Sequence, residues 1–293
     1  MKRAAPIFAL LLLGAVVPAL AQDKVFDAHV HLWGYETSLQ QYLEAAEAAG
    51  AQVDRIGAIQ GGNHMAQQGR LAEMRANNDQ LVALATATEH PEVMPIATVH
   101  PYDGAAAMAE LERLAGLGVH VIKLHPHSQA FDPADPRVLA LCKRAGELGF
   151  VVLIDNANIV AGDSQALFNL SIRAPKTHFV FNHLGGLDFR FWNVLPLANT
   201  AEGLMADNIH FDLSATILLA ADSPIEDEFV WTLRNVGIDN VLLGSDFPQL
   251  SLGKTLEALE KLDLTEEEKR KIRWENAQRI FGGASSGVAG SPE

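Results

Sequence analysis

The 293-residue sequence has very few cysteines and comparatively few basic side chains. Its single cysteine, Cys142, cannot form a disulfide within the chain, so the core alone must stabilise the fold. Lysine and arginine together number 22, against 36 aspartates and glutamates, and the formal net charge is −14. Such a chain has no excess of cations for the phosphates of nucleic acids or anionic lipids. We therefore expect no nucleic-acid partner and no membrane binding by the mature protein.

Long hydrophobic runs are also missing, except at the N-terminus. Lys2 and Arg3 precede the apolar run IFALLLLGAVV, and the small-residue site Ala19-Leu20-Ala21 follows it. This order is typical of a secretory signal peptide, and the run is too short to span a membrane as a mature helix. We expect residues 1–21 to be removed and the mature protein to be periplasmic or secreted.

Short β-branched runs alternate with amphipathic stretches along the rest of the chain. Eight runs are candidate strands, and their starts lie about 25 to 40 residues apart, which is the length of a strand, a helix and two loops. This pattern predicts an α/β protein, a (β/α)8 TIM barrel of parallel strands over residues 22–283, with a disordered tail at 284–293. The alternative is an open doubly wound sheet, but the glycine-rich turn that usually follows its first strand is missing. The candidate strands are residues 24–31, 53–60, 93–100, 119–125, 150–156, 177–183, 208–214 and 240–246.

Two histidines end the first candidate strand, in the stretch FDAHVHLWG. Side chains two residues apart on a strand point to the same side, so we expect Asp27, His29 and His31 to share one face. Two imidazoles at this spacing can reach one metal ion.

Polar side chains end the other candidate strands as well. In a TIM barrel the carboxyl ends of the strands form the active-site face, so these side chains are expected to lie together. Asp246 can ligate a metal and take a proton from bound water, and His183 precedes two glycines that allow a loop to pass close to a ligand. Imidazole and carboxylate ligands suit one divalent ion, Zn²⁺ or Mn²⁺/Fe²⁺. The strand-end residues are Gln60, His100, Lys123, His125, Asp155, His183, Asp212 and Asp246.

Five ordered motifs give the sequence a family resemblance: FDAHVHLWG, VIKLHPH, NHLGG, LLGSDFP and IRWENAQRIFG. Together they resemble the amidohydrolase superfamily, in particular the amidohydrolase-related branch that includes aminocarboxymuconate-semialdehyde decarboxylase. The resemblance covers the chain from about Lys24 to Gly282. It implies that His29, His31 and Asp246 hold one divalent metal, with a further ligand on the fifth strand. It also implies that His183 polarises the water or the substrate.

The fifth strand departs from that family pattern. Where relatives commonly have a histidine, this chain reads VVLIDNAN, with Asp155 at the equivalent place. One interpretation makes Asp155 the fourth metal ligand, in a harder site suited to Mn²⁺ or Fe²⁺. The other makes the metal site degraded, with Asp155 hydrogen-bonded to a neighbour such as His183 or Lys123.

Four further residues are candidates for contact with the substrate. Lys123 and His125 share a strand face and would enter the barrel mouth, whereas Trp33 and Arg190 follow ligand-bearing strand ends and would shape it. Lys123 has two other interpretations: a carboxylated lysine that bridges two metals, as in dinuclear relatives, or one half of a buried structural ion pair.

These expectations lead to a main functional hypothesis and two rivals. The main one is an exported, mononuclear metal-dependent hydrolase that opens an amide, lactone or ester of a small molecule, with Asp246 and His183 as catalytic residues. A decarboxylase of the same fold is the closest rival, and a catalytically lapsed barrel that only binds a small ligand is the third possibility. The sequence leaves a homo-oligomer open.

Overall fold

The computed structural model describes residues 24–60, 66–201 and 207–282. The expected signal peptide at 1–21 and the expected tail at 284–293 lie outside these residues. Within them, no helix is both long enough and apolar enough to cross a membrane.

In the described residues eight strands form the predicted ring, and every ladder between neighbouring strands is parallel. The ladders form two sheets, one of β1 to β3 and one of β4 to β8. Single bridges join the sheets at both seams, Ala97 to Ile122 and Val30 to Phe247, so the ring does not close into one continuous sheet. The strands are β1 (Phe26–His31), β2 (Arg55–Ile59), β3 (Glu92–Ile96), β4 (Val121–Leu124), β5 (Val151–Ile154), β6 (His178–Phe181), β7 (Ile209–Asp212) and β8 (Val241–Leu242).

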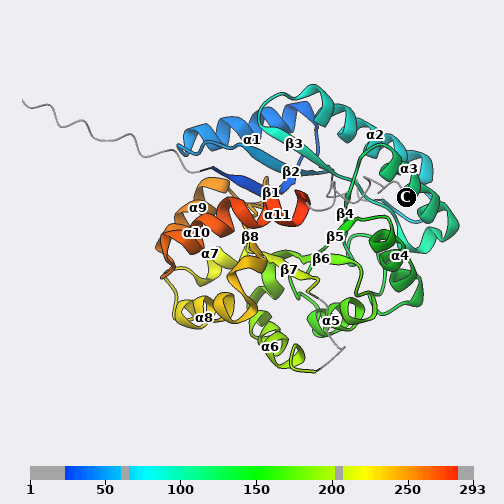
Figure 1. The fold of residues 1–293 in the computed structure, drawn as a ribbon. Coiled ribbons are helices and arrows are strands. Elements are labelled where there is room, and N and C mark those ends of the chain that lie inside the picture. The colour runs from blue at the N-terminus through cyan, green and yellow to red at the C-terminus, as the bar shows by residue number, and fades with distance from the viewer. Residues whose placement is uncertain (1–23, 61–65, 202–206, 283–293) are drawn as a thin grey trace, which may run out of the picture.

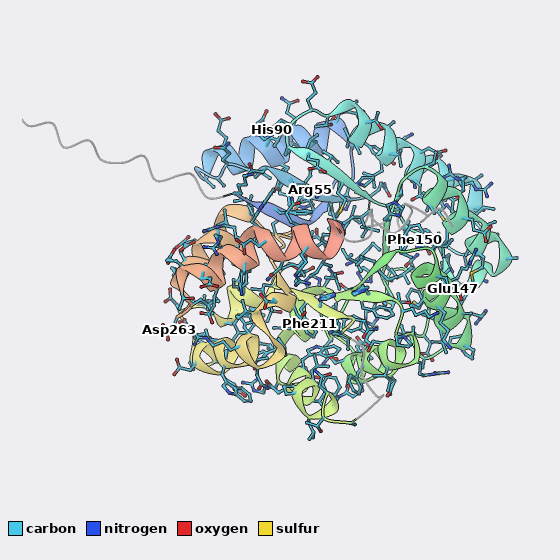
Figure 2. The ribbon with its side chains drawn as sticks, in the orientation of Figure 1. Arg55, His90, Glu147, Phe150, Phe211 and Asp263 are labelled. Carbon is cyan, nitrogen blue, oxygen red and sulfur yellow. The ribbon has the colours of Figure 1, made fainter. Side chains whose placement is uncertain are left out.

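Helices follow the strands and cover the outside of the ring (Figure 1). Their apolar faces and the outer faces of the strands form one large buried cluster, while charged side chains such as Glu147 and Asp263 lie at the periphery (Figure 2). The longer helices are α1 (Glu36–Ala48), α2 (Leu71–Ala87), α3 (Ala105–Gly116), α4 (Pro136–Glu147), α5 (Asp163–Arg173), α8 (Glu226–Val236) and α9 (Leu252–Lys261). Shorter helical segments are η2 (Pro101–Asp103), η3 (Asn182–Val194), α6 (Leu195–Ala198), α7 (Thr216–Ala220), η4 (Ile238–Asn240), α10 (Glu266–Arg270), η5 (Lys271–Glu275) and α11 (Asn276–Gly282).

Helix α11 closes the amino end of the barrel (Figure 1). Its Phe281 ring lies 5.7 Å from the ring of Phe26 at the start of β1, and Ile280 joins the same buried cluster inside the strands. Apolar packing thus fills this end, which leaves the carboxyl ends of the strands for the polar residues.

A bulge in β1 decides which side chains enter the barrel. Asp27 pairs with Ile56 and Val30 with Ala58, so two residues of β1 lie opposite the single residue Gly57. A Cβ on Gly57 would lie 2.6 Å from the carbonyl oxygen of Ala28, so only glycine fits opposite the bulge.

The bulge corrects one prediction. Asp27 does not share a face with His29 and His31: its carboxylate accepts a hydrogen bond of 2.9 Å from Tyr42 of α1, in the outer layer. The extra residue in β1 breaks the alternation of side chains, so His29 points inward although Asp27 points outward.

Candidate metal centre

Three ligand atoms converge at the carboxyl end of the barrel, where β1 meets the segment after β8. The Nε2 atoms of His29 and His31 lie 3.2 Å apart, and Oδ1 of Asp246 lies 3.4 Å from the first and 3.2 Å from the second. All three side chains are buried. Ligand atoms about 2.0–2.2 Å from one ion lie about 3–3.5 Å from each other, so the arrangement suits a shared metal.

The protonation of the two histidines also fits a cation. His29 Nδ1 lies 3.1 Å from Asp212 Oδ2 and 3.2 Å from Ser214 Oγ, which places the proton on Nδ1 and leaves an Nε2 lone pair facing the cluster. Burial lowers the pKa of His31 to about 4, so the His31 ring is neutral at pH 7. Without a cation, a lone pair of His29 would face an anionic oxygen of Asp246. A divalent metal removes this conflict, and the residues present fit it.

Asp212, the last residue of β7, contacts His29 on the side of the ring that faces away from the cluster. Its Oδ1 accepts hydrogen bonds from the backbone nitrogens of His183 at 3.0 Å and Ser214 at 3.1 Å, and its Oδ2 faces His29 and the amide of Asn182. Burial would raise the pKa of this carboxyl, but the attraction and hydrogen bond of His29 outweigh burial and hold it well below its usual range. An ionised carboxylate behind a ligating histidine fixes the orientation of the ring.

The His183 ring lies at the edge of the cluster. Its Nε2 lies 3.1 Å from Asp155 Oδ1 and its Nδ1 lies 3.1 Å from the carbonyl oxygen of Ser214, so both ring nitrogens face acceptors. Burial would lower the pKa of His183, but the hydrogen bond and charge of Asp155 raise it above its usual value. Its ring centroid lies 5.3 Å from that of His29. The His183 ring therefore lies beside the candidate ligands, with both nitrogens directed at acceptors.

The structure pairs Asp155, at the end of β5, with His183. Burial would raise the pKa of Asp155, but the His183 hydrogen bond and the charge of Lys123 keep it well below its usual range. In the described part of the chain, possible metal ligands meet as His29–His31–Asp246 and as His29–His183–Asp212, and Asp155 belongs to neither group. The contact with His183 is the hydrogen bond that the second interpretation names, but it does not show that the metal site is degraded. Its role as a ligand stays a prediction.

The predicted substrate-binding residues lie in different surroundings. Lys123 is buried and donates a hydrogen bond to Asn182 inside the barrel. His125 Nε2 lies 3.8 Å from Asp155 Oδ1, and burial lowers the pKa of His125 to about 4. The half-exposed Trp33 ring lies 6.3 Å from that of His31, next to the cluster. The exposed Arg190 instead forms an ion pair of 2.7 Å with Glu228, a contact outside the cluster.

A cavity of about 470 Å³ opens beside His183. The loops after β5, β6 and β7 form its wall, and three of its non-glycine residues, Asn158, His183 and Ala215, have left-handed φ values. Such backbone strain concentrates at functional sites. The other lining residues are Ala157, Gly186, Leu187, Asp188, Thr216 and Leu219.

Comparison with known proteins assigns the chain to a family. A family model described as amidohydrolase matches residues 26–283. The chain belongs to the amidohydrolase family. The resemblance in the sequence motifs is thereby confirmed, although no curated protein matches the sequence.

Solved structures share the fold of this amidohydrolase at low sequence identity. The 5-carboxyvanillate decarboxylase from Sphingomonas paucimobilis has a TM-score of 0.66 at 15% identity, covering 89% of this chain and 99% of that one. A dihydroxybenzoic acid decarboxylase from Polaromonas sp. JS666, with bound manganese and the inhibitor 2-nitroresorcinol, has a TM-score of 0.62 at 14% identity, covering 89% and 96%. An uncharacterized TIM-barrel protein from Bordetella bronchiseptica has a TM-score of 0.68 at 17% identity, covering 89% and 99%. These likenesses confirm the predicted TIM barrel.

Three polar residues of the site in this amidohydrolase, Asn182, Asp212 and Ser214, have no role in the sequence-based hypothesis. Asp212 was recognised as a strand-end residue but had no assigned role, and Asn182 and Ser214 were not singled out. Asn182 directly precedes His183 in NHLGG, and Ser214 lies two residues after Asp212. The position of Asn182 and Ser214 beside strand-end residues in the sequence is a signal that could identify them. The residues that they contact, however, lie on strands that are distant in the sequence.

Proposed function

We propose that this amidohydrolase is a metal-dependent decarboxylase of a small hydroxylated aromatic acid. The observation that carries the proposal is the convergence of His29, His31 and Asp246 beside the ring of His183 and an adjoining cavity. Two of the structural relatives named above are decarboxylases of such acids, and one of them holds manganese.

In the proposed reaction each group of residues has a separate role. A divalent cation held by His29, His31 and Asp246 would supply a Lewis acid that draws electron density from substrate oxygens. His183, whose pKa is raised by Asp155, would when protonated compensate the negative charge of the substrate carboxylate. The apolar side chains of Leu187 and Leu219 line the cavity and suit the body of an aromatic ring.

Asp246 is assigned the proton transfer. Burial would raise its pKa, but His29 and His31 hold it below its usual range, so Asp246 starts as a carboxylate. It takes the proton of a substrate hydroxyl and returns it to the ring carbon. At that carbon the bond to the carboxylate breaks, the electron pair stays on the ring, and CO₂ leaves. The product departs as a phenolate that water reprotonates.

Hydrolysis, the main hypothesis from the sequence, would use the same ligands and the same carboxylate. Decarboxylation replaces it as the leading proposal because of the named reactions of the relatives. Export of the mature chain also stays a proposal, since it depends on residues 1–21.

A paired assay distinguishes the reactions. Protein loaded with Mn²⁺ or Zn²⁺ is incubated with 2,6-dihydroxybenzoate and 5-carboxyvanillate, and separately with simple amides, lactones and esters. We expect CO₂ release that matches loss of the aromatic acid and disappears in His31→Ala. The matched control, the exposed His90 near the start of β3, should tolerate His90→Ala (Figure 2). Turnover of only the amides, lactones or esters would favour hydrolysis, and inertness towards both panels would favour a lapsed barrel.

A further inference from the structure

A buried lysine connects to the metal cluster through one amide. Lys123 points into the barrel from β4 with 1% exposure, and its Nζ donates a hydrogen bond to Oδ1 of Asn182 at the start of η3. The Nδ2 of the same amide donates to Oδ2 of Asp212. That carboxylate oxygen also lies 3.1 Å from His29 Nδ1. The chain Lys123–Asn182–Asp212–His29 thus runs from β4 through η3 and β7 to β1.

The amide of Asn182 fits this chain in one orientation only. Lys123 offers donors alone and an ionised Asp212 offers acceptors alone, so a flipped amide would set NH₂ against NH₃⁺ and oxygen against carboxylate. A cation on its oxygen polarises the amide and strengthens its donation to Asp212. The amide therefore holds Asp212 Oδ2 where it meets His29.

Lys123 is buried in the barrel interior, and its predicted contact with the substrate stays a prediction. A buried ammonium is costly unless it is paired. Burial lowers the pKa of Lys123, and attraction to three carboxylates, Asp155, Asp212 and Asp246, offsets part of that effect. The hydrogen bond to Asn182 gives the Lys123 amine a direct partner. Asn182 and these carboxylates all lie in the barrel interior, around the candidate metal ligands.

We propose that Lys123 and Asn182 are positioning residues of the metal centre: through Asp212 they hold His29 in the orientation and tautomer that a metal requires. The inference rests on the proposed metal site but not on the proposed reaction. Loss of a partner that orients a metal-ligating histidine typically weakens metal binding by about 10- to 100-fold.

The test measures Co²⁺ binding by titration and the visible absorption of bound Co²⁺, which reports ligand geometry without turnover. The variants Asn182→Asp and Lys123→Met keep the volume of each side chain but remove the donor to Asp212 and the cation, respectively. The matched control is Lys269→Met, because Lys269 is also a buried lysine but pairs with Glu260 in the outer layer.

We expect both chain variants to raise the Kd for Co²⁺ by about 10-fold or more and to change the absorption bands, with Lys269→Met like the wild type. If Lys123→Met does not fold, the Kd and the absorption bands of Asn182→Asp alone test the proposal. A Kd within about twofold of the wild type, with unchanged bands, would show that the two residues are merely structural. A wild type that binds no Co²⁺ would overturn both the site and this inference, whereas Co²⁺ binding without turnover would overturn only the reaction.

Discussion

Replacing Asp155 by asparagine tests whether it acts on His183 rather than on the metal. The substitution keeps the shape of the side chain and removes its charge. Because the Asp155–His183 contact of 3.1 Å is buried, its loss should lower the free energy of unfolding by about 1.5–3 kcal/mol, the range for hydrogen bonds to charged groups. The metal content should remain near that of the wild type.

The pH dependence follows from the two pKa shifts. The raised pKa of His183 means that its contribution to stability is complete below about pH 6.5 and is lost as the pH rises through the folded-state value. The lowered pKa of Asp155 means that its contribution is present above about pH 4 and is lost as the pH falls further. The gap between wild type and Asp155→Asn should therefore be widest between about pH 4 and 6.5 and shrink in alkali.

Urea unfolding at pH 5.5 and pH 9, with elemental analysis of both proteins, measures these quantities. The chain offers a matched control in Asp163, whose carboxylate lies 3.0 Å from the exposed His127. Asp163→Asn should cost only about 0–1 kcal/mol, the range for surface pairs. Loss of metal in Asp155→Asn would make Asp155 a ligand. A stability difference that is the same at both pH values would contradict a charged pair between Asp155 and His183.

Three further outcomes are expected. Gly57→Ala should lower the free energy of unfolding in urea by about 1–3 kcal/mol and weaken metal binding, because its Cβ would lie 2.6 Å from the Ala28 carbonyl oxygen. The control Gly116→Ala should have neither effect, because a Cβ there has no neighbour within 4 Å. Leu219→Asp should raise the KM for an aromatic acid with little change in melting temperature, and an equal effect from the exposed Leu197→Asp would argue against the cavity. N-terminal sequencing of protein from the bacterial periplasm should begin at residue 22, and recovery of an intact N-terminus from the cytoplasm would contradict export.

The sequence was sufficient for the barrel and for the convergence of three side chains that are candidate metal ligands. The alternation of β-branched runs and helices determines the strand order, and the carboxyl ends of parallel strands meet on one face whatever their loops do. His29, His31 and Asp246 could therefore be grouped although more than 200 residues separate the first from the last.

The surroundings of these ligands could not be predicted from the sequence. The bulge opposite Gly57 breaks the two-residue alternation, and only the paired strands reveal it. The partners of Lys123 and Asp155 depend on side-chain directions around the ring, which a linear pattern does not contain. Arg190 looked available to a substrate because it follows NHLGG, but its partner Glu228 comes from α8.

The metal content of the purified protein tests the central claim most directly. The wild type is reconstituted with Mn²⁺, freed of excess metal and measured by elemental analysis beside His29→Ala. We predict about one metal ion per wild-type chain and almost none in the variant. A wild type without metal, or a variant that keeps it, would contradict a metal centre built on His29, His31 and Asp246.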